Sequence, residues 1–161
     1  MVTRGAAPDA VTLTAGILTG AMAIYHFALP ISFHWDEVLH QVPMLRWGVW
    51  MINACMSFLL LAGGVMTVAI AFEPPPRGRT STWVLRGMGG FWLFNATCQV
   101  VVPMPLPPRL AGLRLLFLGF AAGLLVLYAV PLLRSRLRGG PRTEPSAPTP
   151  SGTLPGRRGP P

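Results

Sequence analysis

Residues 45–72 read LRWGVWMINACMSFLLLAGGVMTVAIAF, and this apolar run decides the fold. A helix needs roughly 20 mostly apolar residues to cross the hydrocarbon core of a bilayer. Three further runs, residues 11–29, 83–102 and 110–133, are also long enough to do so. We therefore predict an integral membrane protein with four transmembrane helices.

The four runs lack the alternation of apolar and polar residues that a membrane β-strand shows. Backbone polar groups inside lipid must be paired within their own element, so we expect α-helices. The chain has 161 residues, of which 52% are hydrophobic, and this leaves room for one small domain. We predict an all-α, up-down-up-down four-helix bundle over residues 1–138. Residues 139–161 are rich in Pro, Gly and Arg, which predicts a disordered tail.

The net charge of +8 comes from arginines that flank the apolar runs. Arg4 precedes the first run, Arg77 and Arg79 lie between the second and third, and Arg134 and Arg136 follow the fourth. The other two connections carry fewer arginines, so the positive-inside rule predicts both termini in the cytoplasm of a cell with an inner (plasma) membrane. Because topology accounts for the charge, we expect no nucleic-acid partner.

The first run has an alternative interpretation as a cleaved signal sequence, because Arg4 lies before it. Its length exceeds the roughly 7 to 15 residues of a typical signal core. No small-residue cleavage motif follows the run before the charged connection. A transmembrane span is therefore the favoured interpretation.

Aromatic residues predict the two membrane boundaries. Trp35, Trp47 and Trp50 are expected at the outer boundary, and Trp83 and Tyr128 at the inner one. The amphipathic connection at residues 31–42 predicts a short interfacial helix. The proline-rich connection at residues 73–82 predicts a stiff basic turn.

Two glycine pairs predict close helix packing. Gly16 with Gly20, and Gly119 with Gly123, have the GxxxG spacing that lets two helix backbones approach. The partner is either another helix of the same bundle or a second membrane protein, including a second copy of this chain.

Polar residues in the apolar runs lie at similar depths. Counting 1.5 Å per residue places most of them in the outer half of the bilayer, while the inner half is expected to be nearly free of polar groups. Arg114 is the costliest of them, and it either faces a polar interior or extends its side chain to the membrane surface. We predict a pocket open to the outer leaflet, lined by Tyr25, His26, Asn53, Ser57, Asn95, Gln99 and Arg114.

His26 is the only histidine within the four runs. It either forms a structural hydrogen bond to a neighbouring helix or acts as a proton donor and acceptor towards a lipophilic substrate. For catalysis, Asp36 or Glu37 would supply the second group of an acid–base pair, which requires the connection to fold over the pocket mouth.

His34, Glu37 and His40 follow one another at three-residue intervals, so a helix would place them within one arc. They form a weak candidate metal site, because zinc sites normally have a fourth ligand and tighter spacing. A solvated polar face explains the same residues. We expect no cofactor, since a bis-histidine haem site needs histidines on two spans.

The segment Tyr25-His26-Phe27-Ala28-Leu29-Pro30, followed by Arg46-Trp47-Gly48, resembles small four-helix bacterial membrane proteins of the DoxX-like type. The resemblance implies a four-helix membrane architecture over residues 11–133. It assigns no catalytic residue.

No nucleotide-binding, metalloprotease or serine-hydrolase motif is present in the sequence. The leading hypothesis is therefore a non-enzymatic accessory or binding component that takes a lipophilic small molecule or a partner helix. The alternative is a membrane isomerase or cofactor-poor oxygenase acting on a quinone, sterol, terpenoid or polyketide.

Overall fold

The computed structural model describes residues 7–103 and 108–138, and within these ranges every regular element is helical. The predicted disordered tail at residues 139–161 lies outside the described residues, as do residues 1–6 and 104–107. In chain order the elements are α1 (Ala10–Ser32), α2 (Trp35–Val38), α3 (Pro43–Ala71), α4 (Arg79–Val101), the 3-10 turn η1 (Pro108–Leu110) and α5 (Ala111–Arg138). The predicted all-α class is confirmed for this part of the chain.

Three of the long helices, α1, α3 and α5, are long and apolar enough to cross a membrane. Their outward faces carry large exposed apolar side chains, including Ile24, Leu59 and Leu116. Water does not favour so large an apolar surface, whereas lipid does. Helix α4 does not meet the same criterion, and polar residues, among them Arg86, Asn95 and Gln99, occur along it.

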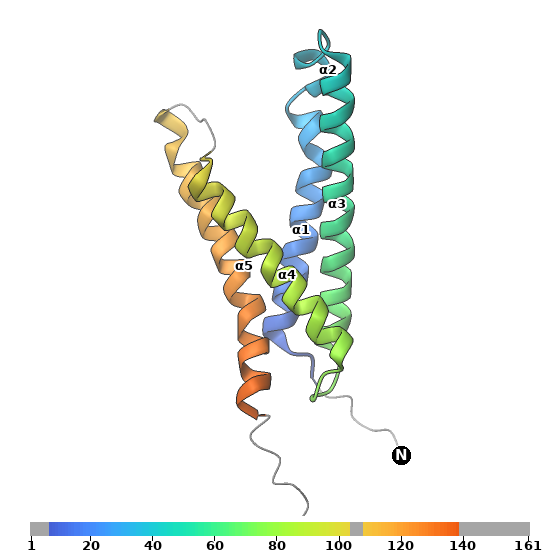
Figure 1. Ribbon diagram of the computed structural model, residues 1–161, viewed down its shortest axis with the longest axis vertical. Helices are drawn as coiled ribbons and strands as arrows, with labels where there is room; N and C mark the ends of the chain where they lie inside the picture. The colour runs from blue at the N-terminus through green and yellow to red at the C-terminus, as the bar shows by residue number, and fades with distance from the viewer. Residues whose placement is uncertain (1–6, 104–107, 139–161) are drawn as a thin grey trace, which may run out of the picture.

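The helices form two antiparallel pairs (Figure 1). Helices α1 and α3 lie side by side along their length, and α4 packs on α5. The pairs meet at the end where α1 begins and α5 ends, mainly through contacts between α1 and α5. They diverge towards the opposite end, which carries α2 and is called the α2 end below.

Glycines bring α1 and α3 together. A Cβ atom on Gly16 would lie 2.8 Å from the backbone nitrogen of Val68 and 2.9 Å from the carbonyl oxygen of Gly64. Backbone atoms cannot move aside as a flexible side chain can, so the position of Gly16 requires glycine. Gly119 and Gly123 have no neighbour within 4 Å of such an atom, so the second GxxxG pair makes no close contact in the described structure.

A buried hydroxyl cluster joins three helices where the two pairs meet. Tyr128 of α5 lies 3.0 Å from the hydroxyl of Thr19 and 3.2 Å from that of Thr67, and all three side chains are fully buried. Thr67 already donates to the carbonyl of Gly63, so Tyr128 donates to Thr67 and accepts from Thr19. Tyr128 was predicted at the inner membrane boundary, and in the structure its side chain is fully buried between three helices.

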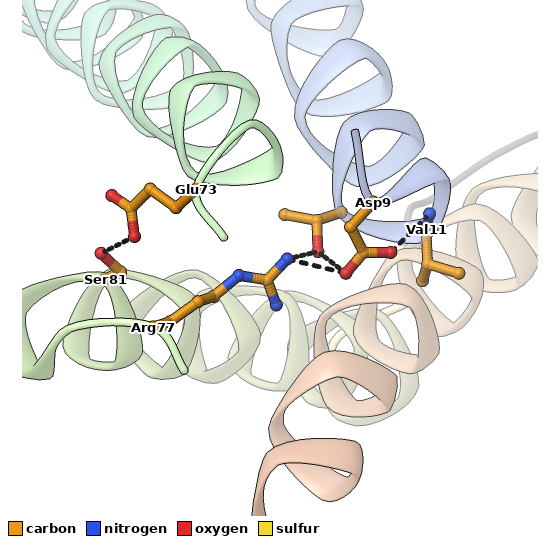
Figure 2. Close-up of polar contacts among 6 residues, drawn as sticks. Asp9, Val11, Glu73, Arg77 and Ser81 are labelled. Atoms are coloured by element: carbon orange, nitrogen blue, oxygen red, sulfur yellow. Dashed lines mark hydrogen bonds and ion pairs between the residues drawn. The ribbon is translucent and has the colours of Figure 1, made fainter. Parts of the chain in front are cut away.

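An ion pair connects the start of α1 to the α3–α4 connection (Figure 2). Asp9 caps α1 by accepting from the backbone N–H of Val11, and it also accepts from Arg77 at 2.7 Å. Thr12 donates to the same carboxylate. Burial raises the pKa of Asp9, but hydrogen bonds from Arg77 and Thr12 and the charge of Arg77 outweigh it, leaving the pKa below 3.8.

The α3–α4 connection is shorter than predicted. Helix α4 begins at Arg79, so the last residues of the predicted turn at residues 73–82 are helical. Ser81, in the first turn of α4, donates to the carboxylate of Glu73 at 2.6 Å (Figure 2). This bond pairs two polar side chains that the predicted turn would have left to solvent.

Candidate functional site

Helix α1 continues through Pro30 to Ser32, two residues beyond the proline that was predicted to end it. Proline has no N–H, so the carbonyl of His26, four residues earlier, loses its helical partner. The side chain of Asn53 on α3 replaces that partner by donating to the His26 carbonyl at 2.8 Å. Inside a membrane this compensation is what permits the helix to continue.

The same asparagine orients the His26 ring. Its side-chain oxygen lies 3.4 Å from Nδ1 of His26, and since an amide oxygen only accepts, Nδ1 is the donor. Nε2 of a neutral ring is then left as an acceptor. Ser57, one turn further along α3, is buried and donates to the backbone carbonyl of Asn53 at 2.7 Å.

A cavity of about 600 Å³ lies between the two helix pairs. This volume is within the range typical of small-molecule sites. Its lining comes from all five α-helices together with η1 and the α1–α2 connection, and most of the lining surface is apolar. The lining residues are Met22, Tyr25, His26, Leu29, Phe33, Trp35, Met56, Leu60, Phe91, Trp92, Asn95, Gln99, Leu110, Leu113, Arg114, Phe117 and Phe120.

Five of the seven predicted pocket residues line this cavity, namely Tyr25, His26, Asn95, Gln99 and Arg114. The other two, Asn53 and Ser57, lie outside the lining. Asn53 bonds to α1, and Ser57 bonds within α3. Gln99 donates to the side-chain oxygen of Asn95 at 2.7 Å, so the two amides present one joined polar surface. The Asn95 amide nitrogen is left as a donor.

Trp92 is a lining residue to which the sequence assigned no role. Its side chain is 2% exposed, and it packs edge-to-face with Phe91 and Phe120, at centroid distances of 5.2 and 5.9 Å. Its indole N–H is buried without a hydrogen-bond partner in the described structure. A buried donor without a partner costs about 1–3 kcal/mol, so this group calls for an acceptor. A tryptophan inside an apolar run gives no sequence signal of that need.

Arg114 is exposed and also lines the cavity. The two ion pairs found among the described residues are Asp9 with Arg77 and His34 with Glu37, so neither involves Arg114. Within residues 7–103 and 108–138, the cavity lining contains no Asp or Glu. Among the described lining residues, Arg114 therefore contributes a formal positive charge that no carboxylate compensates.

The predicted acid–base pair is not assembled around the cavity. Asp36 and Glu37 are exposed on α2 and lie outside the lining. Trp35 of α2 lines the cavity instead, and it is held edge-to-face against Trp50 of α3 at a centroid distance of 6.4 Å. The predicted interfacial helix at residues 31–42 is reduced to the single turn of α2, and Trp35 of this turn contributes to the cavity lining.

The predicted metal ligands do not form a three-residue group. His34 precedes α2 with a left-handed backbone, and its Nδ1 lies 3.9 Å from the Glu37 carboxylate. Nδ1 of His40 lies 2.7 Å from the backbone carbonyl of Glu37, so it is engaged with the main chain. In the part of the chain that the structure describes, no three His, Cys, Asp or Glu side chains are grouped as a metal site.

Neither protein-family models, curated proteins nor solved structures give a match to this chain. The functional argument therefore depends on the geometry and chemistry of the cavity. That geometry combines apolar walls, joined amides, an oriented imidazole and one guanidinium. Such a site suits a molecule that is mostly apolar and has a polar group at one end.

Proposed function

We propose that the protein is a non-enzymatic membrane component that binds a lipophilic small molecule between its two helix pairs. The observation that carries the proposal is the cavity of about 600 Å³, with mostly apolar walls and a few convergent polar groups. This combination is typical of small-molecule sites. A partner's transmembrane helix is the other occupant that an opening between two helix pairs admits.

Catalysis has less support than binding. The enzyme hypothesis needs a carboxylate beside His26, and Asp36 and Glu37 lie outside the cavity lining. The His26 ring is also hydrogen-bonded to Asn53, and Asn53 donates to the backbone carbonyl of His26 that Pro30 leaves without a helical partner. We therefore assign His26 a structural role and a place in the binding surface.

For membrane placement we propose four spans, with α4 as the fourth, in the inner membrane of a bacterial cell. Both termini would be cytoplasmic. The support is the arginines near the end where the helix pairs meet, among them Arg77, Arg79, Arg86, Arg134 and Arg136. The cavity, near the α2 end, would then open to the outer leaflet. The DoxX-like resemblance of residues 25–30 remains part of this proposal.

The test is mass spectrometry of small molecules extracted from the protein purified in lipid nanodiscs. Met56→Trp places a large ring in the cavity, because Met56 lines it. Leu59→Trp is the matched control, since Leu59 is 60% exposed on the outward face of the same helix. We expect a small molecule in stoichiometric amount from the native protein and from Leu59→Trp, and its loss from Met56→Trp.

Two results would contradict the proposal. One is an extract that contains only the bulk nanodisc lipids, at the same ratio in all three proteins. The other is a stoichiometric molecule whose amount Met56→Trp leaves unchanged, because a ligand in the cavity must compete with the added indole.

A further inference from the structure

The polar groups of the cavity lining lie towards the α2 end, among apolar residues such as Phe33 and Leu113, whereas the opposite end of the lining is apolar. Gln99 and Arg114 lie towards the α2 end of α4 and α5, with Asn95 one turn deeper. Beyond them the walls are apolar, formed by Met22, Met56, Leu60, Phe91 and Phe120. A molecule that fills the cavity must therefore have its polar group towards the α2 end and its apolar part towards the junction of the helix pairs.

Among the described polar groups of the lining, Nε2 of His26 and the side-chain oxygen of Gln99 are left as acceptors, whereas Asn95 and Arg114 are left as donors. Asn95 already accepts from Gln99, so it offers its amide N–H groups. Arg114 offers a guanidinium, which donates and never accepts. An ionised carboxylate is the complementary head, because it only accepts.

The charge of the described lining residues also favours an anionic head group. Arg114 supplies a positive charge to the lining, and no described Asp or Glu side chain of the lining opposes it. In the low dielectric of a bilayer such a charge is stabilised by an anion with which it can form paired hydrogen bonds. A neutral or cationic head would leave the guanidinium without a counter-charge.

We propose that the occupant is a single-chain anionic amphiphile of the long-chain carboxylate class, with its head at Arg114 and its chain against the apolar end. This inference depends on the proposed function, because it names the ligand of the same cavity. Arg114 acts as the specificity-determining residue, and the apolar wall supplies the remaining binding energy without selecting for charge.

The experiment uses the full chain in nanodiscs of zwitterionic lipid, with empty nanodiscs subtracted. The probes are radiolabelled oleate, oleyl alcohol and oleylamine, which share a chain and differ in the charge of the head. We expect oleate to bind at one molecule per chain, about 10-fold or more tighter than oleyl alcohol, and oleylamine to bind weakest. A 10-fold difference corresponds to about 1.4 kcal/mol.

Two arginine variants locate the effect. Arg114→Gln should remove the preference for oleate while keeping the binding of oleyl alcohol, which also shows that the protein is folded. Arg114→Glu should favour oleylamine. Arg46→Gln is the matched control and should leave all three affinities unchanged. Arg46 lies in the first turn of α3, which is also near the α2 end of the molecule, and it is outside the cavity lining.

The outcomes separate this inference from the proposed function. If none of the three probes binds saturably, the proposed function fails. If the probes bind equally, if oleylamine binds best, or if Arg114→Gln leaves the oleate preference intact, the ligand class is overturned while lipophile binding stands.

Discussion

At the scale of single residues, Asn53 has the most consequential contact. It donates to the carbonyl that Pro30 leaves without a partner, and it fixes which nitrogen of His26 donates. One side chain thereby lets α1 continue past a proline and sets the orientation of a lining imidazole. The contact also joins α1 to α3 at the level of the cavity.

The role of Asn53 predicts a coupling with Pro30. Asn53→Ala leaves the His26 carbonyl unpaired in an apolar setting, which should lower the free energy of unfolding by about 1–3 kcal/mol. In a Pro30→Ala background the backbone N–H at residue 30 can take that carbonyl, so the cost of Asn53→Ala should fall by about 1 kcal/mol. Reversible unfolding in mixed micelles measures both costs. Equal costs in the two backgrounds would contradict the assignment.

Asp9 predicts a dependence of stability on pH. Because the folded-state pKa of Asp9 is lowered from 3.8, its ion pair stabilises the protein fully above that value. The contribution is lost as pH falls through the lower, folded-state pKa. Thermal unfolding should therefore show a higher midpoint for the native protein than for Asp9→Asn at pH 7.

The difference between these two midpoints should close as the pH is lowered below about 3.8. Asn retains a side-chain oxygen for the helix cap, so the comparison isolates the charge. A difference that stays constant across the titration would show that the carboxylate charge contributes nothing.

At the scale of elements, the contact of α1 with α3 depends on one face of α1. Gly16→Ala places a methyl group against the backbone of α3, whereas a Cβ on Gly20 meets nothing within 4 Å. We expect Gly16→Ala to lower the free energy of unfolding by about 1–3 kcal/mol, as overpacking does. Gly20→Ala should change it by less than about 0.5 kcal/mol. Equal effects in the same unfolding assay would mean that α1 presents another face to α3.

The sequence predicted where helices lie better than where they end. An apolar run records the part of a helix that lipid surrounds, while backbone hydrogen bonding continues into polar residues. Helix α4 therefore begins at Arg79 instead of residue 83, and α5 continues to Arg138 instead of residue 133. Helix α4 is not among the helices apolar enough to span a membrane, and it carries Arg86, Asn95 and Gln99 along its length.

The sequence predicts a depth for each polar residue, but it does not predict the direction in which the side chain faces. Counting along each run placed five side chains in one layer, yet Asn53 turns to the α1–α3 contact while Gln99 and Arg114 line the cavity. Helix rotation decides this difference, and distant residues determine the rotation. The pairing of Tyr128 with Thr19 and Thr67 escaped prediction for the same reason.

At the scale of the whole molecule, two tight helix pairs join at one end and diverge at the other (Figure 1). The buried hydroxyl cluster and the ion pair of Asp9 with Arg77 lie where the pairs meet. The cavity lies between the pairs, where they separate towards the α2 end, and Trp35 contributes to its lining. The two pairs are thus joined at one end, and the cavity between them has both apolar and polar lining residues.

Saturable photolabelling tests lipophile binding in this cavity most directly. The native protein in nanodiscs is irradiated with a diazirine-bearing long-chain alcohol, with and without excess oleyl alcohol, and the labelled residues are mapped by mass spectrometry. The account predicts labelling of Met56 and Trp92 that the competitor abolishes, and labelling of outward-facing Leu59 and Phe94 that it does not. Competitor-insensitive labelling at all four residues, or none at Met56 and Trp92, would contradict it.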